Sequence, residues 1–327
     1  MEHENPQFEN RTDLSELQQA VADIKQELHK IIIGQDHFIE LLLVALIADG
    51  HVLIEGVPGI AKTITAKLFA KTLKTDFSRI QFTPDLMPSD VLGTSVYNQQ
   101  SNEFELKKGP IFSNIVLIDE INRAPAKTQA ALFEVMEERQ ITIDGKTQAL
   151  KAPFMVLATQ NPIEQEGTYA LPEAQLDRFL FKINVGYPDP EEEIAILKTH
   201  QERKNEAATD IVQAVLNTKT IAKIKAMRFD VRAEPNMLKY ITDLVVKTRN
   251  HPYLYLGASP RASLAIMNAA KVFAAMDGRD FIIPEDVKKC LAPVLQHRIV
   301  LNPEKEMEGF KPEQVIDMIV KSVDVPR

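Results

Sequence analysis

The chain has 327 residues, of which 45% are hydrophobic, so it can bury a core in two domains or in one large and one small domain. Its formal net charge of -8, from 46 acidic and 38 basic side chains, argues against nucleic acid as the main partner. The single cysteine, Cys290, excludes an internal disulfide framework, and the polar start of the chain has no signal-peptide pattern. We therefore expect a cytoplasmic protein. The longest apolar stretch, 39–48, is about half of the roughly 20 residues that a membrane crossing needs, so no transmembrane helix is expected.

Two helices are predicted before the first strand. After a polar start, apolar residues recur at helical spacing from Leu14 to Leu28, which indicates an amphipathic leading helix. Gly34 interrupts this pattern. Residues 35–49 then predict a largely buried helix, because apolar side chains cover most of its circumference.

Strands and helices alternate from there to about Tyr187, which predicts a parallel sheet covered by helices. Within 141–150, β-branched residues flank Asp144-Gly145, a pair typical of a tight antiparallel hairpin. After Pro188 the pattern is almost entirely helical with no further strand, so we place the domain boundary there. The expected strands are 51–55, 79–82, 115–118 and 154–159, and the expected helices include 62–72, 127–138, 236–249, 260–276 and 284–295.

A glycine-rich motif lies between the strand at 51–55 and the next helix, in the order that a phosphate-binding loop requires. Glycines let backbone N–H groups point at phosphate oxygens, Lys62 can reach the β- and γ-phosphates, and the Thr63 hydroxyl can bind Mg²⁺. Ala61 replaces the usual glycine, which is harmless only if this residue has the negative φ of a helix start. The motif reads Gly56-Val57-Pro58-Gly59-Ile60-Ala61-Lys62-Thr63.

Two adjacent carboxylates, Asp119 and Glu120, follow the apolar residues 115–118. This is the pattern of a buried strand that presents acids at its carboxyl end. Asp119 would hold Mg²⁺, directly or through its water, and Glu120 would polarise an attacking water. The alternative is an N-cap aspartate followed by a solvated glutamate. With the phosphate loop upstream, we favour a site for ATP and Mg²⁺.

At this point the chain resembles the AAA+ ATPases and, more narrowly, the MoxR family, whose phosphate loop often reads GVPGxAKT. The resemblance covers nearly the whole chain and implies a P-loop AAA+ α/β domain with a parallel sheet, followed by a C-terminal all-α helical lid domain. The further segments that carry it are Ile33-Gly34-Gln35, Ile121-Asn122-Arg123-Ala124-Pro125, Ala158-Thr159-Gln160-Asn161-Pro162, Leu171-Pro172-Glu173-Ala174-Gln175-Leu176-Asp177-Arg178-Phe179 and Ser259-Pro260-Arg261-Ala262.

The resemblance also implies a division of the chain. Residues 1–22 would form an N-terminal arm and leading helix, 23–188 the ATPase core, and 189–327 a helical linker segment and the lid. The core would contain a helix-2 insertion at about 83–110 and a pre-sensor 1 hairpin at about 140–151, both directed toward the pore of a ring. Within the insertion, 85–92 can form a short helix and the polar stretch 97–105 suits an exposed contact loop.

The resemblance implies functional roles for three polar residues. Asn161 matches the sensor 1 residue, Arg178 the arginine finger that a neighbouring subunit supplies, and Arg261 the sensor 2 arginine. Read alone, they could be a turn asparagine, a surface ion-pair residue and a solvated helix-start arginine. Arg123 is a rival for the finger, and Arg261 could serve its own nucleotide or a neighbour's. The segment Ile33-Gly34-Gln35 resembles the adenine-side segment, although it could equally be a helix terminator.

The resemblance implies an ATPase that converts ATP and water to ADP and phosphate in a homo-oligomeric, hexameric ring. Its output would be the remodelling or maturation of protein clients, commonly with a von Willebrand factor A domain partner. Two other functions stay open. One is a nucleotide-gated binding switch with slow turnover, and the other is a nucleic-acid motor, against which the acidic balance argues.

Overall fold

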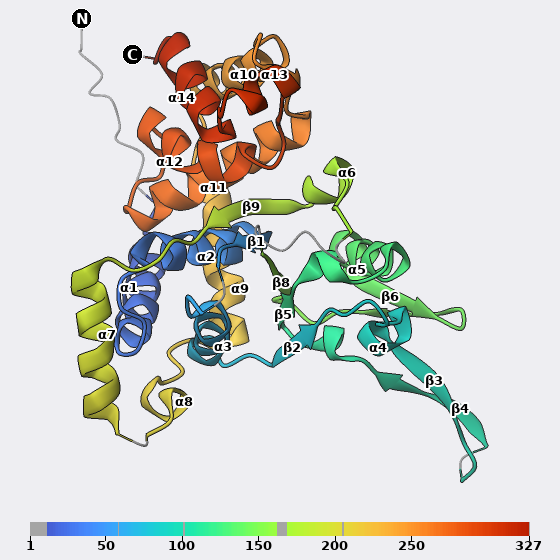
Figure 1. The fold of residues 1–327 in the computed structure, drawn as a ribbon. Helices are drawn as coiled ribbons and strands as arrows, with labels where there is room; N and C mark the ends of the chain where they lie inside the picture. Colours follow the sequence, from blue (N-terminus) through green and yellow to red (C-terminus); the bar gives the residue numbers. More distant parts are fainter. Residues whose placement is uncertain (1–11, 58, 101, 162–168, 205, 327) are drawn as a thin grey trace, which may run out of the picture.

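The computed structural model describes residues 12–57, 59–100, 102–161, 169–204 and 206–326 (Figure 1). The start of the expected N-terminal arm, Pro58 of the glycine-rich motif and Pro162 lie outside these ranges. None of the helices in the described ranges is long and apolar enough to cross a membrane.

The centre of the molecule is a five-stranded parallel sheet in the order β2-β5-β8-β1-β9. Because the strands are parallel, all five carboxyl ends meet at one edge of the sheet. The strands are β1 (His51–Glu55), β2 (Phe77–Gln81), β5 (Ile115–Asp119), β8 (Met155–Gln160) and β9 (Phe179–Asn184). The helices α2 (Asp36–Ala48), α3 (Lys62–Thr72) and α5 (Ala126–Glu138) pack on them, and α1 (Ser15–His29) packs on α3.

Successive strand residues feed two hydrophobic cores, because side chains of a strand alternate between the faces of a sheet. Leu53, Val116 and Val156 pack with α5 on one face. Val52 and Leu117 pack with α1, α2 and α3 on the other. This alternation, with helices on both faces, is the layered arrangement that the sequence predicted.

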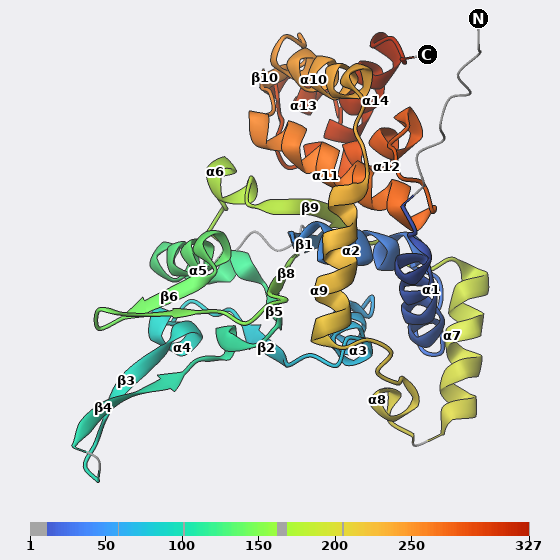
Figure 2. The same cartoon turned by 180° about the vertical axis from the view of Figure 1, so that it is seen from behind.

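Two antiparallel hairpins and several short elements extend from this sheet. Figures 1 and 2 show both hairpins projecting on the side away from the C-terminal helices. The hairpins are β3 (Gly93–Asn98) with β4 (Glu103–Lys108) and β6 (Gln140–Ile143) with β7 (Lys146–Ala149), and the short elements are α4 (Pro88–Leu92), η1 (Pro110–Phe112), η2 (Ile121–Arg123) and α6 (Glu173–Leu176).

A helical segment and a helical bundle complete the chain. The segment consists of α7 (Pro190–Arg203), α8 (Ala208–Ile211), α9 (Thr218–Met227) and η3 (Arg228–Asp230). We refer to residues 235–326 as the helical lid. It contains α10 (Pro235–Arg249), α11 (Pro260–Met276), α12 (Pro284–Leu295), α13 (Pro303–Met307), α14 (Pro312–Ser322) and the short strands β10 (Leu254–Leu256) and β11 (Val300–Leu301).

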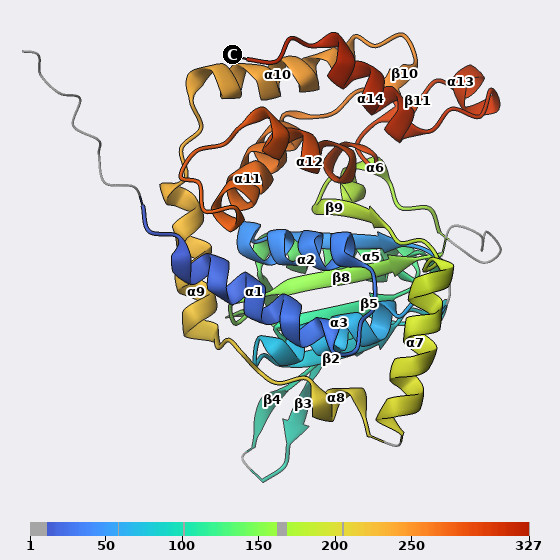
Figure 3. The same ribbon diagram turned by 90° about the vertical axis from the view of Figure 1, so that its left-hand side faces the viewer.

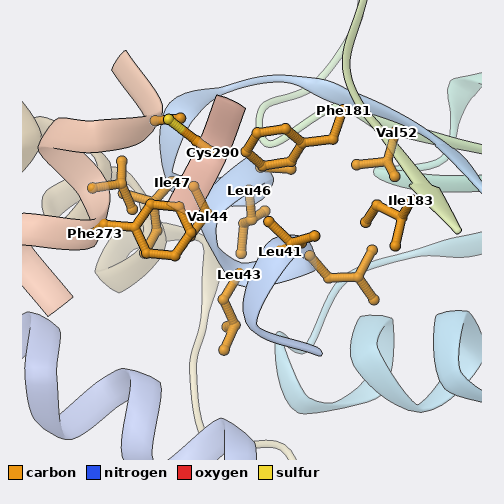
Figure 4. Close-up of a cluster of buried hydrophobic side chains, with 14 of the residues drawn as sticks. Leu41, Leu43, Val44, Leu46, Ile47, Val52, Phe181, Ile183, Phe273 and Cys290 are labelled. Carbon is orange, nitrogen blue, oxygen red and sulfur yellow. The ribbon is translucent and has the colours of Figure 1, made fainter. Parts of the chain in front are cut away.

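Helix α2 is buried around most of its circumference, as its apolar sequence predicted, because it packs between the sheet and the lid (Figure 3). Figure 4 shows Leu41 and Leu46 of α2 among Phe181 of β9, Phe273 of α11 and Cys290 of α12. The lid therefore shares one hydrophobic core with the sheet.

The lid also covers the exposed edge of β9, which is an outer strand of the sheet. His297 Nε2 lies 3.0 Å from the carbonyl oxygen of Phe179, and Arg298 Nη1 donates to the carbonyl of Leu180. Gln296 Nε2 donates to the carbonyl of Lys182. These side chains occupy acceptors that an edge strand would otherwise present to other chains.

Most of the expected elements are confirmed. The five helices named by range agree with α3, α5, α10, α11 and α12 within one residue, and the expected strands overlap β1, β2, β5 and β8. The hairpin turn is also confirmed, since Asp144 and Gly145 have φ of 49° and 75°, as a tight hairpin turn of this type requires.

Three expectations about the secondary structure are wrong. The stretch that we expected as an exposed loop, 97–105, forms much of the hairpin β3–β4, although it is exposed. Strand β9 was not among the expected strands. The lid does contain strands, the pair β10 and β11, but these span only three and two residues, too few for a periodic signal.

Ala61 does not have the negative φ that would make its replacement of glycine harmless. Ala61 has φ 61° and ψ 13°, which is the left-handed region, and it lies at the N-cap of α3. A side chain with a Cβ is disfavoured there by roughly 1–2 kcal/mol. The glycine of the general pattern therefore has a conformational reason, and this chain holds alanine in the strained conformation.

His51 lies fully inside the protein at the start of β1. Its Nδ1 accepts from the backbone N–H of Val156 (3.0 Å), and its Nε2 lies 3.1 Å from the carbonyl oxygen of Met136. Both bonds are satisfied by a neutral ring with the proton on Nε2. Burial, with a smaller contribution from Arg139, lowers the pKa of His51 from 6.5 to about 4.

We expect His51 to make stability depend on pH. The pKa in the folded state is below the unfolded value, so the contribution is complete above pH 6.5 and is lost as pH falls toward 4. The loss amounts to about 2 kcal/mol by pH 5 and about 3 kcal/mol in all. Urea unfolding at pH 7.5 and pH 5 measures it. His51→Gln, which cannot titrate, should show a smaller decrease, and an equal decrease in both proteins would contradict the assignment.

Ala61→Gly should leave stability unchanged or raise it by up to about 1 kcal/mol, because glycine adopts positive φ without steric cost. The matched control is Ala222→Gly in the exposed interior of α9, which should cost about 1 kcal/mol because φ there is helical. Thermal unfolding of the two variants and the parent protein gives the comparison. If both substitutions destabilise the protein equally, Ala61 is not strained.

Candidate functional site

The carboxyl edge of the sheet collects the polar residues of the two motifs. Gln81 of β2 pairs in register with Asp119 of β5, and Glu55 of β1 pairs with Gln160 of β8. The glycine-rich loop leaves β1 directly after Glu55, and Asn161 directly follows β8. The loop, the acid pair and Asn161 therefore lie at the same edge, which is where parallel α/β sheets bind ligands.

The glycine-rich loop is closed by bonds to its own backbone. Lys62 Nζ donates to the carbonyl of Gly56 at 2.6 Å. Gly56 itself lies so close to the end of β9 that an added Cβ would be 2.6 Å from the carbonyl oxygen of Val185. Val57 packs against the core, and Ile60 is buried. Thr63 follows Lys62 in the first turn of α3.

The segment Ile33-Gly34-Gln35 contacts this loop. Gln35 Nε2 donates to the carbonyl of Ile60 at 3.0 Å, and Gln35 Oε1 is buried without a hydrogen-bond partner among the described residues. A Cβ added at Gly34 would lie 2.3 Å from Glu192 Oε1, so the start of α7 packs against this segment. The segment thus links α2, α7 and the loop.

Side chains from β2 and β8 hold the acid pair. Arg79 Nε donates to Asp119 Oδ2 at 2.6 Å, and Thr159 Oγ1 donates to Asp119 Oδ1 at 3.2 Å. Gln81 Nε2 donates to Glu120 Oε2 at 2.8 Å. Asp119 is only 8% exposed, whereas its neighbour Glu120 is half-buried with φ 58°. The two carboxylates therefore have different surroundings, as two different roles require.

Arg123 lies beside the acid pair of its own chain. Its Nε is 2.9 Å from Glu120 Oε2. Asn161, at the end of the neighbouring β8, is 9% exposed. Both residues thus belong to the carboxyl edge, together with the loop.

Lys62 is electrostatically close to these acids. Burial lowers the pKa of Lys62, and the carboxylates of Asp119, Glu120 and Glu55 act against this shift. Because the ammonium group of Lys62 is already partly desolvated, a bound phosphate would remove little further hydration from it.

Arg178 and Arg261 lie elsewhere. Arg178 directly precedes β9, and Phe179 pairs with His51 at the start of β1, so Arg178 is at the amino edge of the sheet. Its Nε is 3.6 Å from Glu137 Oε2, and Arg261 Nη2 is 3.1 Å from Glu137 Oε1. Both arginines therefore meet at one carboxylate near the end of α5. They do not join the residues of the loop.

The residues at the carboxyl edge fit a nucleotide phosphate chain with Mg²⁺. Gly59 has φ 88° and open space where a Cβ would lie, so the loop can cradle an anion closely. Lys62 and the start of α3 supply positive charge, and Thr63 and Asp119 supply the oxygen ligands that Mg²⁺ prefers. Pro58, which the motif includes, lies outside the described residues.

Sequence reasoning missed several residues that the site uses. Arg79 and Gln81 flank the buried Ile80 in β2, so the period-2 alternation could have placed both on one face of that strand. Glu137, Asp177 and Arg298 gave no such signal. Their partners are distant in sequence, and only the folded chain brings them together.

Models of known protein families match both the region of the sheet and the lid. A family model described as "ATPase family associated with various cellular activities (AAA)" matches residues 51–181, and one described as "AAA lid domain" matches 246–319. The first range includes the loop, the acid pair, Asn161 and Arg178, and the second includes Arg261.

Relatives extend this similarity over nearly the whole chain. Chaperone MoxR1 of Mycobacterium tuberculosis is 44% identical over 95% of this chain and 82% of its own length. The uncharacterized protein YeaC of Bacillus subtilis is 46% identical over 92% of this chain and 93% of its own length. A crystal structure from Cytophaga hutchinsonii, of an ATPase by provisional assignment, is 42% identical with a TM-score of 0.89 and covers 96% of this chain and 97% of that one. With both family models matched and relatives of this identity and coverage, the chain belongs to the MoxR family of AAA+ ATPases.

Proposed function

We propose that this chain hydrolyses ATP, with Mg²⁺, in a hexameric ring whose nucleotide sites are shared between neighbouring subunits. The position of Arg178 carries this proposal. Arg178 lies at the amino edge of the sheet and the phosphate loop at the carboxyl edge, so the length of β1, roughly 13 Å, separates them. An arginine of this chain that neutralises phosphate charge from there must act on another subunit.

In this proposal Arg261 also acts on the nucleotide of the neighbouring subunit. Because Arg178 and Arg261 both bind Glu137, they would face the neighbour's nucleotide together. Arg123, which binds Glu120 of its own chain, is then less suited to the role of the finger. Two guanidinium groups aimed at one phosphate chain stabilise the charge that develops in phosphoryl transfer.

In this proposal the residues of the carboxyl edge bind the nucleotide and Mg²⁺ and activate the attacking water. The backbone of the loop and Lys62 would bind the phosphates, and Ile33-Gly34-Gln35 would hold the adenine side. Thr63 and Asp119 would hold Mg²⁺, which when bound neutralises phosphate charge. Glu120 would orient and polarise the attacking water, and the amide of Asn161 would fix that water or the terminal phosphate.

The output of this reaction in our proposal is mechanical work on a protein client. The hairpin β3–β4 presents Phe104 and Tyr97, which are 65% and 47% exposed and pack at 5.3 Å between ring centroids. A cleft of about 510 Å³ separates this hairpin from β6–β7 and is lined by Phe104, Leu106 and Ile143 among others. Exposed aromatic residues on projecting hairpins suit contact with an unfolded or flexible client.

The remaining parts of the proposal concern the surroundings of the ring. The chaperone name of the Mycobacterium relative supports work in remodelling or maturation. We propose a von Willebrand factor A domain protein as a further partner and the cytoplasm as the compartment, where Cys290, the single cysteine, stays reduced. The expected division into 1–22, 23–188 and 189–327 is part of the same proposal.

Glu120→Gln should lower the kcat of ATP hydrolysis by at least about 100-fold and leave ATP binding intact, because the amide keeps the shape but cannot polarise water. Steady-state hydrolysis and binding of a fluorescent ATP analogue measure the two effects. Glu134→Gln on the exposed face of α5 is the control and should be fully active. Client processing that survives Glu120→Gln would instead favour a nucleotide-gated switch.

Arg178→Ala should bind ATP but hydrolyse it poorly, and its activity should return on mixing with Glu120→Gln subunits. Each inactive variant supplies the half-site that the other lacks. At equal amounts, at most about one quarter of the wild-type rate is expected, since half of the sites keep Glu120 and half of their neighbours keep Arg178. The control mixture, Lys62→Ala with Glu120→Gln, should stay inactive because neither subunit has a complete carboxyl edge. Failure of the first mixture to regain activity would falsify the shared site.

A further inference from the structure

One carboxylate joins the lid to the sheet directly beside Arg178. Asp177, the preceding residue, accepts from Arg298 Nε on Oδ1 at 2.6 Å and from Ser259 Oγ on Oδ2 at 3.0 Å. Ser259 and Arg298 both belong to the lid but come from separate segments of it. Asp177 therefore fixes two parts of the lid against the start of β9.

Arg298 is buried and fully engaged in this junction. It is 8% exposed, and its Nη2 donates to the carbonyls of Asp177 (3.1 Å) and Phe179 (2.6 Å). Its Nη1 donates to the carbonyls of Leu180 and Val294. Burial lowers the pKa of Arg298 and Asp177 opposes this shift, so the aspartate is the charge partner of a buried guanidinium. Such a pair does not tolerate the loss of one partner.

Ser259 extends the junction to Arg261. Its Oγ donates to Asp177 and accepts from the backbone N–H of Arg261 at 3.2 Å, as the N-cap of α11. The backbone of Arg178 is one peptide bond from Asp177, and that of Arg261 is two hydrogen bonds away. The two side chains then meet again at Glu137.

We propose that Asp177 is a positioning residue that holds Arg178 and Arg261 as one unit, so that a movement of the lid moves both arginines relative to the neighbouring subunit's nucleotide. This inference rests on the shared site proposed above. Asp177 touches no substrate in this scheme and acts only through the two arginines. A displacement of about 1 Å of such groups can lower a rate by about 100-fold.

The test uses the mixing assay. In this assay the arginines of one subunit act at the nucleotide site of its neighbour, so their effect on hydrolysis is measured separately from the subunit's own site. Asp177→Asn is introduced into Glu120→Gln subunits, which are mixed with Arg178→Ala subunits. We expect the restored activity to be at least about tenfold lower than in the mixture whose first subunit carries only Glu120→Gln. In the otherwise intact protein, Asp177→Asn should lower kcat. Its affinity for a fluorescent ATP analogue should change by less than about threefold.

A second ion pair of the lid, which also has one buried partner, supplies the matched control. Asp286 is 0% exposed and binds Arg279 through both carboxylate oxygens, each at 2.7 Å, without contact to either proposed catalytic arginine. Asp286→Asn in Glu120→Gln subunits should therefore leave the restored activity unchanged. If it lowers that activity as much as Asp177→Asn does, a general loosening of the lid explains both results and the inference is wrong.

Ser259 keeps the inference testable if Asp177→Asn does not fold. Ser259→Ala removes only the hydroxyl between Asp177 and Arg261, whereas Ser259→Thr retains it. We expect Ser259→Ala to lower the restored activity and Ser259→Thr to preserve it. Equal restoration by both variants would overturn the inference.

The same assay separates this inference from the proposal beneath it. If Glu120→Gln and Arg178→Ala subunits restore no activity together, the shared site is wrong and the role of Asp177 is wrong with it. If they restore activity and Asp177→Asn changes nothing, the shared site stands and only the role of Asp177 is rejected.

Discussion

The parallel direction of the five strands is the constraint on which the rest of this structure depends. It gives the sheet two chemically different edges, one with the phosphate loop, the acid pair and Asn161, and one with Arg178. A subunit with half of a site at each edge completes that site only through a head-to-tail contact with a second copy. Contacts of this kind generate rings when their rotation closes. Strand polarity is thus the feature of the fold that supports the proposed ring.

The outer strand β9 makes the lid part of that arrangement. An uncovered outer strand invites pairing with other chains, and here side chains of the lid occupy its carbonyls. The cost is a buried guanidinium, Arg298, which needs Asp177 as its charge partner. Because Asp177 adjoins Arg178, the contacts that protect the edge of the sheet also connect the lid to an arginine proposed for catalysis.

Local signals predicted much of the fold and of the carboxyl edge, whereas features set by tertiary contacts were missed. The acid pair follows an apolar strand, and the Asp144-Gly145 turn specifies its own backbone, so both are readable over a few residues. The strand pair β3–β4 was missed because neither strand has a fully buried residue to mark its alternation. The positive φ of Ala61 depends on how the loop closes. The pair formed by Asp177 and Arg298 joins positions 121 residues apart, which no local pattern encodes.

The charged groups proposed for the site already have partners in this structure. Lys62 binds the carbonyl of Gly56, Glu120 binds Gln81, and the two arginines bind Glu137. These groups are half-buried or exposed, and contacts of charges that remain near water contribute little to stability. A nucleotide that offers phosphate oxygens to the lysine and to a neighbour's arginines can therefore replace these contacts at a modest cost. The same exchange would free the carbonyl of Gly56 at one edge and the carboxylate of Glu137 at the other, so in the proposed shared site nucleotide binding and the arrangement of neighbouring subunits depend on each other.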